Sequence, residues 1–139
     1  MPRWRNSDLD FLPISEDGFL RVDNSGEVDN KSWAKRWPNF KPQELDSDDF
    51  SLVISVDALD ALQRVRDEYG KPMRVTCAYR NPRHNKRVGG RPGSSHLAGV
   101  AFDIAIPNTA AGKRIEKLAV KHGFTGIGRY PSRLSLIHI

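Results

Sequence analysis

The sequence predicts an α+β fold, with a small antiparallel sheet and helices packed on it. Apolar residues recur at three- and four-residue steps in two stretches, which is typical of amphipathic helices. Short apolar runs bounded by Gly and Pro lie between these stretches and are typical of strands. The 139 residues suffice for one hydrophobic core, and a hydrophobic share of 38% indicates a loop-rich domain.

The two predicted helices have recognisable ends. The first runs from Ser55, a residue type that caps helix N-termini, to Tyr69. The second runs from Asn108 or Thr109 to His122. A glycine follows each helix, as is common at helix C-termini. Both helices are expected to pack an apolar stripe against the core.

Three strands and one long loop complete the predicted domain. The strands are Met73–Ala78, Val100–Ile106 and Phe124–Tyr130. The loop Asn81–Gly93 is rich in Gly, Pro and Arg, and loops on a rigid scaffold often carry function.

The N-terminal residues 1–36 are predicted to form an extension of unknown role, and residues 37–139 the domain itself. Asp, Asn, Ser and Gly recur in the extension, which favours short strands or irregular structure. Trp33 and Trp37 stand four residues apart and are expected on one face of a short helix. We interpret them as packing residues, because aromatic side chains are mostly buried.

Composition limits the possible partners and the location. The formal charge of +5 suits nucleic acid, an anionic membrane or an acidic polymer such as a bacterial wall, or simply solubility. Basic residues cluster at Arg80–Arg91 without interleaved aromatics, which argues against nucleic acid. Met1–Arg5 precede no long apolar run, so we expect no signal peptide, no membrane span and synthesis in the cytoplasm. The single cysteine, Cys77, excludes an intramolecular disulfide and is predicted to be a buried small hydrophobe.

A histidine and an aspartate form a candidate metal site. His96 and Asp103 are seven positions apart, too many for adjacent turns of one helix. A loop that carries His96 followed by a strand that carries Asp103 would bring them together, and Gly99 and Ala101 would let the backbone pass closely. Imidazole and carboxylate are both good zinc ligands. Alone, such a pair is more often an ordinary loop histidine and strand-end aspartate than a metal site.

Several motifs surround this pair in a fixed order. They are Met73–Pro82, His84–Gly90, Ser94–Asp103, Gly123–Pro131 and Ile137–His138. In this order they resemble the zinc D,D-peptidase family, the D-alanyl-D-alanine carboxypeptidases and their relatives in bacteria and bacteriophages. The resemblance covers roughly residues 37–130, and the ordered set is far more specific than any one motif. The chain departs from the family pattern at Cys77, where Ser is usual, and at Ala78, where Gly is usual.

The resemblance implies a hedgehog/D,D-peptidase-like zinc fold and a set of site residues. Zn²⁺ would be held by His96, Asp103 and His138, and Arg80 would polarise the substrate. The implied substrate-binding residues are Tyr79, Ser94 and Ser95. The implied reaction is metal-assisted hydrolysis of peptidoglycan stem peptides, with a carboxylate as general base. We therefore expect a monomer with peptidoglycan as its partner and no nucleic acid or membrane partner, which reaches the wall after release from the cell or in a phage particle.

The last six residues, 134–139, complicate this interpretation. They coincide with the peptide that the end of a transposon-type sequencing adapter encodes, and we expect the natural chain to continue differently after Arg133. The alternative is a native ending in which His138 is a ligand. In either case Ser135 occupies a position where some branches carry an acidic base. A catalytically inactive wall-binding or phage structural module of the same fold therefore stays an alternative, as does a basic nucleic-acid-binding domain.

Overall fold

The computed structural model describes residues 11–138, and side chains as far as residue 136. The start of the predicted extension, residues 1–10, lies outside this range. The described chain contains two antiparallel sheets, five α-helices and one 3₁₀ turn. In chain order the elements are β1 Phe19–Val22, η2 Ser25–Glu27, α1 Asn30–Arg36, α2 Pro42–Leu45, β2 Leu52–Ser55, α3 Val56–Tyr69, β3 Arg74–Cys77, α4 Pro82–Arg87, β4 Ala101–Ala105, α5 Thr109–Lys121, β5 Phe124–Tyr130 and β6 Arg133–His138.

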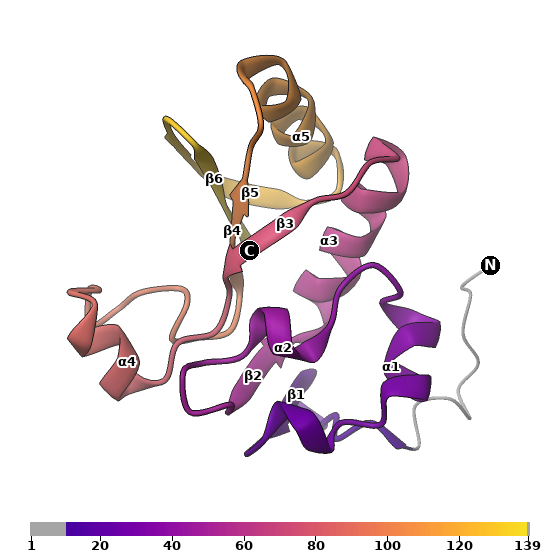
Figure 1. Cartoon of the computed structure of the whole chain (residues 1–139), viewed down its shortest axis with the longest axis vertical. Helices are drawn as coiled ribbons and strands as arrows, with labels where there is room; N and C mark the ends of the chain where they lie inside the picture. The colour runs from indigo at the N-terminus through magenta and orange to yellow at the C-terminus, as the bar shows by residue number, and fades with distance from the viewer. Residues whose placement is uncertain (1–10, 139) are drawn as a thin grey trace.

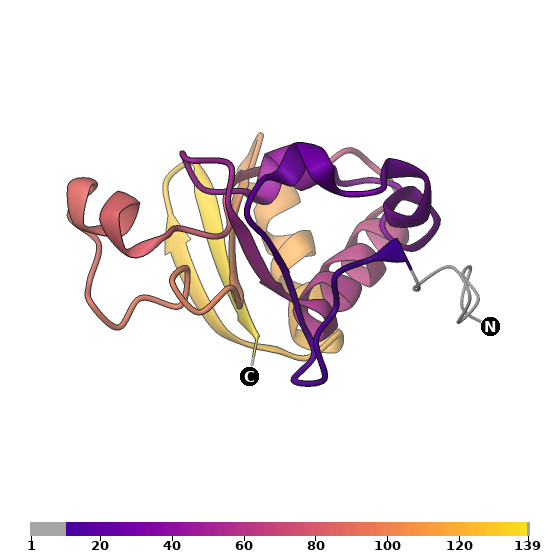
Figure 2. The same ribbon diagram turned by 90° about the horizontal axis from the view of Figure 1, so that it is seen from below.

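The larger sheet has the strand order β3-β4-β6-β5, with every neighbouring pair antiparallel. Figures 1 and 2 show α3 and α5 on one face of this sheet, while α4 and its loop project on the other side. Alternate residues of the two central strands, Phe102 and Ile104 in β4 and Leu134 and Leu136 in β6, are buried in the core. The intervening residues of these strands face away from the helices. This arrangement confirms the predicted α+β fold class.

The long periodic elements lie where the sequence predicts them. The Ser55 side chain accepts a hydrogen bond from the Ala58 backbone N–H at 3.2 Å and caps α3. Gly70 ends that helix in the left-handed conformation with φ +73°. Asn108 caps α5 in the same way as Ser55 caps α3. The three predicted strands correspond to β3, β4 and β5 within one residue at each end.

Residues before the predicted domain contribute to the same core. β1 pairs with β2 in the smaller sheet, and Leu20 of β1 has no exposed surface. The expected helix around the two tryptophans is α1, which Trp37 ends. The rings of Trp33 and Trp37 pack edge to face with centroids 4.7 Å apart, and both are buried. Their interpretation as packing residues is confirmed, whereas the domain boundary at residue 37 stays a prediction.

The segment 81–93, predicted as a loop, contains the short helix α4. Asn81 caps it by accepting the His84 backbone N–H at 2.8 Å, and Pro82 occupies its first turn. The helix has six residues, all polar except Pro82, so no apolar periodicity could reveal it. A cap followed by Pro was the available signal.

Gly99 fixes the approach of the histidine loop to the smaller sheet. Its φ is +71°, and a Cβ at this position would lie 2.3 Å from the carbonyl oxygen of Val53. The Ser55 backbone N–H donates to the Gly99 carbonyl at 2.8 Å. The backbone at Gly99 therefore packs closely against the backbone of β2, as the glycine predicted. This contact fixes where β4 begins.

Among the described residues, no helix combines the length and the apolar character that crossing a membrane requires.

Candidate metal centre

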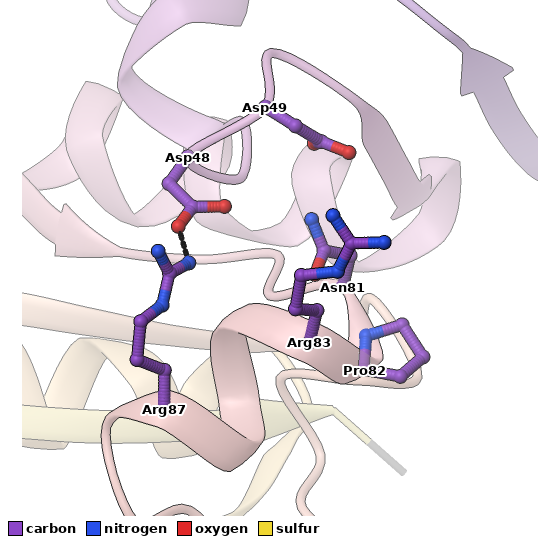
Figure 3. Close-up of a pocket in the computed structure, with 6 residues that line it drawn as sticks. All are labelled: Asp48, Asp49, Asn81, Pro82, Arg83 and Arg87. Atoms are coloured by element: carbon purple, nitrogen blue, oxygen red, sulfur yellow. Dashed lines mark ion pairs between the residues drawn. The ribbon is translucent and has the colours of Figure 1, made fainter.

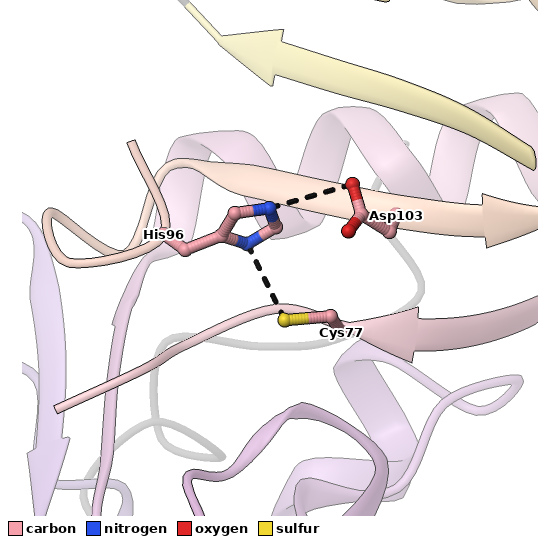
Figure 4. Close-up of side chains that lie close together, drawn as sticks. All are labelled: Cys77, His96 and Asp103. Carbon is pink, nitrogen blue, oxygen red and sulfur yellow. Dashed lines mark hydrogen bonds and ion pairs between the residues drawn. The ribbon is translucent and has the colours of Figure 1, made fainter. Parts of the chain in front are cut away.

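The predicted pair meets on the open face of the larger sheet. His96 lies in the turn-rich segment before β4, and Asp103 lies in the middle of that strand. The Nε2 atom of His96 is 3.4 Å from Oδ1 of Asp103, and both residues are buried. Cys77, at the end of β3, is the third member of this cluster, as Figure 4 shows.

A backbone carbonyl sets the proton on the histidine ring. Nδ1 of His96 lies 2.6 Å from the carbonyl oxygen of Ala78, which only accepts hydrogen bonds, so Nδ1 carries a proton and donates it. In a neutral ring Nε2 is then an acceptor, and it faces another acceptor on Asp103. Two acceptors this close require either a proton between them or a metal ion at that place.

The spacing of these two atoms suits a metal. Ligands at about 2.0–2.2 Å from a tetrahedral zinc lie roughly 3.4 Å from each other. The observed separation of Nε2 and Oδ1 is 3.4 Å, whereas a hydrogen bond is usually at most about 3.2 Å. A backbone carbonyl on the other ring nitrogen is also the usual partner of a metal-binding histidine. The pair therefore fits zinc, and His96 and Asp103 would supply two of its ligands.

Without a metal the ring holds its second proton tightly. Burial alone would lower the pKa of His96, but the hydrogen bonds with Asp103, Cys77 and the Ala78 carbonyl outweigh it and raise that pKa to about 9. For Asp103, burial would raise the pKa, but hydrogen bonds from His96 and Ser135 and the charges of His96 and Arg133 lower it. The metal-free site is thus an ion pair at neutral pH.

Two residues of β6 reach Asp103 from the neighbouring strand. Ser135 lies opposite Asp103 in the strand pairing and donates a hydrogen bond to its Oδ1. Nη1 of Arg133 lies 3.5 Å from Oδ2. The guanidinium of Arg133 also lies over the Tyr130 ring, 4.4 Å from its centroid. No sequence pattern assigns a role to Arg133 and Tyr130, because only the pairing of β4 with β6 brings them to the site.

Arg80 follows β3 and forms hydrogen bonds with the segment that carries His96. Its Nη2 donates to the Ser94 hydroxyl at 3.1 Å, and its backbone N–H donates to the His96 carbonyl at 3.2 Å. The Ser94 hydroxyl also accepts the His96 backbone N–H at 3.3 Å. The Nε atom of Arg80 is buried and has no hydrogen-bond partner among the described residues. The residue as a whole lines the cleft that contains the pair.

A cleft of about 540 Å³ contains these groups. Besides the His96–Asp103 pair it is lined by Arg80, Arg91, Ser94, Ser95, Arg133 and Ser135. The structure thus brings together the predicted arginine and both predicted serines with the predicted metal pair. Tyr79 is buried and is not among the described residues that line the cleft. The side chain of His138 lies outside the described part of the chain, so its role as a ligand stays a prediction.

Cys77 differs from its prediction. It is half-buried rather than buried, and its Sγ lies 3.7 Å from Nδ1 of His96. The register between β3 and β4 shifts just before it, at the irregularity between Val75 and Cys77. A change of side-chain direction at such an irregularity is the physical reason for the difference. The thiol therefore belongs to the surroundings of the histidine rather than to the core.

A second pocket, of about 490 Å³, lies between the 47–51 turn and α4 (Figure 3). Asp48 and Asp49 lie across it from Arg83 and Arg87, and Arg87 forms an ion pair with Asp48. The Ser47 hydroxyl accepts the backbone N–H of the capping residue of α4 at 3.0 Å. The acidic turn thus anchors the segment that leads to the metal cleft.

Comparison with known proteins identifies the family. A search of curated proteins gives no match. The family model described as Peptidase M15 matches residues 33–139, which include β3, β4, the histidine segment and β6. The match covers most of the chain and all of the residues that line the metal cleft. This protein therefore belongs to the M15 family of peptidases, which are typically zinc-dependent.

Proposed function

We propose that this protein is a zinc-dependent peptidase that hydrolyses peptide bonds in peptidoglycan stem peptides, as a D,D-carboxypeptidase or an endopeptidase of the endolysin type. The observation that carries the proposal is the His96–Asp103 pair, spaced at 3.4 Å inside an arginine-lined cleft. The family match supports the peptidase class. The resemblance of the motif order to the D,D-peptidases of bacteria and phages supports the substrate.

His96 and Asp103 would hold zinc with one more ligand from β6. The ion supplies Lewis acidity and makes a hydrolytic water more acidic. The Ala78 carbonyl keeps the His96 ring oriented, and Ser135 orients the carboxylate of Asp103. Arg80, fixed through Ser94, would stabilise negative charge that develops on a peptide carbonyl oxygen.

The charge of the cleft supports a substrate with carboxylates. Arg80, Arg91 and Arg133 line it, and Asp103 is the one carboxylate among its described lining residues. Stem peptides carry free carboxyl groups, and a guanidinium pairs with a carboxylate through two parallel hydrogen bonds. A peptidase that cuts beside a terminal carboxylate needs such a cation beside its metal.

The scarcity of carboxylates in the cleft also supports one alternative. A hydrolytic water requires a base, and the described part of the cleft offers no carboxylate besides the one that would bind the metal. A wall-binding or phage structural module that keeps the fold without catalysis fits this observation.

Turbidity of purified bacterial walls separates the two functions. The peptidase should clear the walls, and a chelator should stop the clearing until zinc is restored, with His96→Ala as the inactive control. Binding to walls without any clearing would favour the module. If the protein neither clears the walls nor binds to them, peptidoglycan is not its partner.

A further inference from the structure

The metal site has a defined third position on β6, and we propose that it is residue 135. In this chain a serine occupies that position, so His96 and Asp103 form an incomplete site that a histidine at 135 would complete. This inference rests on the proposed zinc site and deepens it.

The strand register is the first argument. Ser135 lies directly opposite Asp103, and cross-strand partners project on the same face of a sheet. Its neighbours Leu134 and Leu136 are buried on the helix-covered face. Ser135 is therefore the residue between them that faces the cleft, which it lines together with His96.

Contact with the ligand pair is the second argument. The Ser135 hydroxyl hydrogen-bonds to the same Oδ1 atom of Asp103 that lies 3.4 Å from Nε2 of His96. A side chain here reaches the place where the metal is expected. A catalytic zinc usually has three protein ligands, and a neutral serine hydroxyl is not among the common ones. The backbone of His138 pairs instead with Phe124, three positions along the strand from Ser135.

The test measures zinc affinity by competition with a chromophoric chelator and uses the visible spectrum of the cobalt(II)-loaded protein. Ser135→His is expected to bind zinc about 100-fold more tightly than the parent chain, since even partners of ligands contribute about 10- to 100-fold. It should also give the intense absorption of tetrahedral cobalt. The matched control is Ser132→His, which adds a histidine to the exposed turn of the same hairpin. Its affinity should equal that of the parent.

A second variant covers the case in which histidine disturbs the strand. Ser135→Cys is close to isosteric with the parent residue. Made in a Cys77→Ser protein, it should give a sulfur-to-cobalt charge-transfer band, and the Cys77→Ser protein alone should lack this band. Position 135 would be overturned if Ser135→His and Ser132→His bound zinc equally tightly and Ser135→Cys gave no charge-transfer band. Loss of zinc from the parent on His138→Ala or Cys77→Ser would overturn it too, because the third ligand would then be elsewhere. If His96→Ala changes nothing and no variant binds zinc, the proposed function itself fails.

Discussion

The behaviour of the site is decided by one histidine ring. The Ala78 carbonyl holds the proton of Nδ1, which leaves Nε2 to face Asp103. The sequence predicted both members of the pair from residue types and from motif order. It could not predict the carbonyl, the thiol of Cys77 or the hydroxyl of Ser135, because these depend on backbone register rather than on residue identity.

Stability of the metal-free protein should fall as pH rises from about 6.5 to about 9. The folded protein raises the pKa of His96 from 6.5 to about 9, so it binds the ring proton more tightly than the unfolded chain does. This stabilisation is complete below pH 6.5 and is lost above 9. We expect a loss on the order of 2 kcal/mol in denaturant unfolding with a chelator present.

The substitution His96→Gln should remove most of this pH dependence. His84→Gln is the matched control, since His84 bonds to Ser47 instead of Asp103, and it should leave the dependence in place. An unchanged profile in His96→Gln would contradict the assignment.

The substitution Arg80→Lys should lower peptidase activity about 10²- to 10³-fold, the cost of losing one donor to a developing oxyanion. Lysine keeps the charge but cannot hold Ser94 and present a second donor at once. Zinc content should not change. Arg83→Lys, in the second pocket, controls for a general effect of the exchange. Full activity in Arg80→Lys would exclude this role.

Among the elements, those with an apolar stripe or a bounded apolar run were predictable, whereas α4, β1 and β2 were not. Helix α3 has both a cap and an apolar stripe, and the sequence located it within one residue. Helix α4 and strands β1 and β2 are held by capping, by ion pairs and by each other. The ion pair and the strand pairing join residues far apart in the chain and leave no local pattern, whereas the cap of α4 is local.

The substitution Gly99→Ala should destabilise the protein by roughly 1–3 kcal/mol or more. The added Cβ would meet the Val53 carbonyl at 2.3 Å, and φ is positive at this residue. Because Gly99 connects His96 to β4, zinc affinity should fall as well. Thermal unfolding and zinc titration measure the two effects.

Gly93→Ala is the matched control for this prediction. Gly93 has no atom within 4 Å of an added Cβ and no positive φ, so its change should be close to neutral. Equal effects of the two substitutions would contradict the close approach.

Across the whole molecule, one core unites the larger sheet with residues that precede the family match, namely Leu12, Leu20 and Val28. Polar contacts also join α1 to α3. The Arg36 guanidinium binds Asp60 of α3, and the indole of Trp37 donates to the same carboxylate at 2.8 Å. The fold class followed from composition and periodicity. The contribution of residues 12–32 did not, because their buried side chains are too scattered to form a pattern.

The substitution Leu20→Ala should therefore lower the free energy of unfolding by about 2–5 kcal/mol. Leu20 is fully buried, although it lies before the region that the family match covers. Chemical denaturation measures the change, and Val88→Ala, at an exposed position, is the control. A negligible effect would show that the N-terminal residues pack independently of the peptidase core.

The strand order also governs when this protein can fold. β6 lies between β4 and β5 although it follows both in the chain. A ribosome releases the earlier strands first, so one edge of β4 and the whole of β5 lack their partner in the sheet until β6 emerges. Unpaired edges invite pairing with other chains. Completion of the sheet therefore has to follow synthesis of β6, and the protein is most exposed to pairing with other chains before that strand appears.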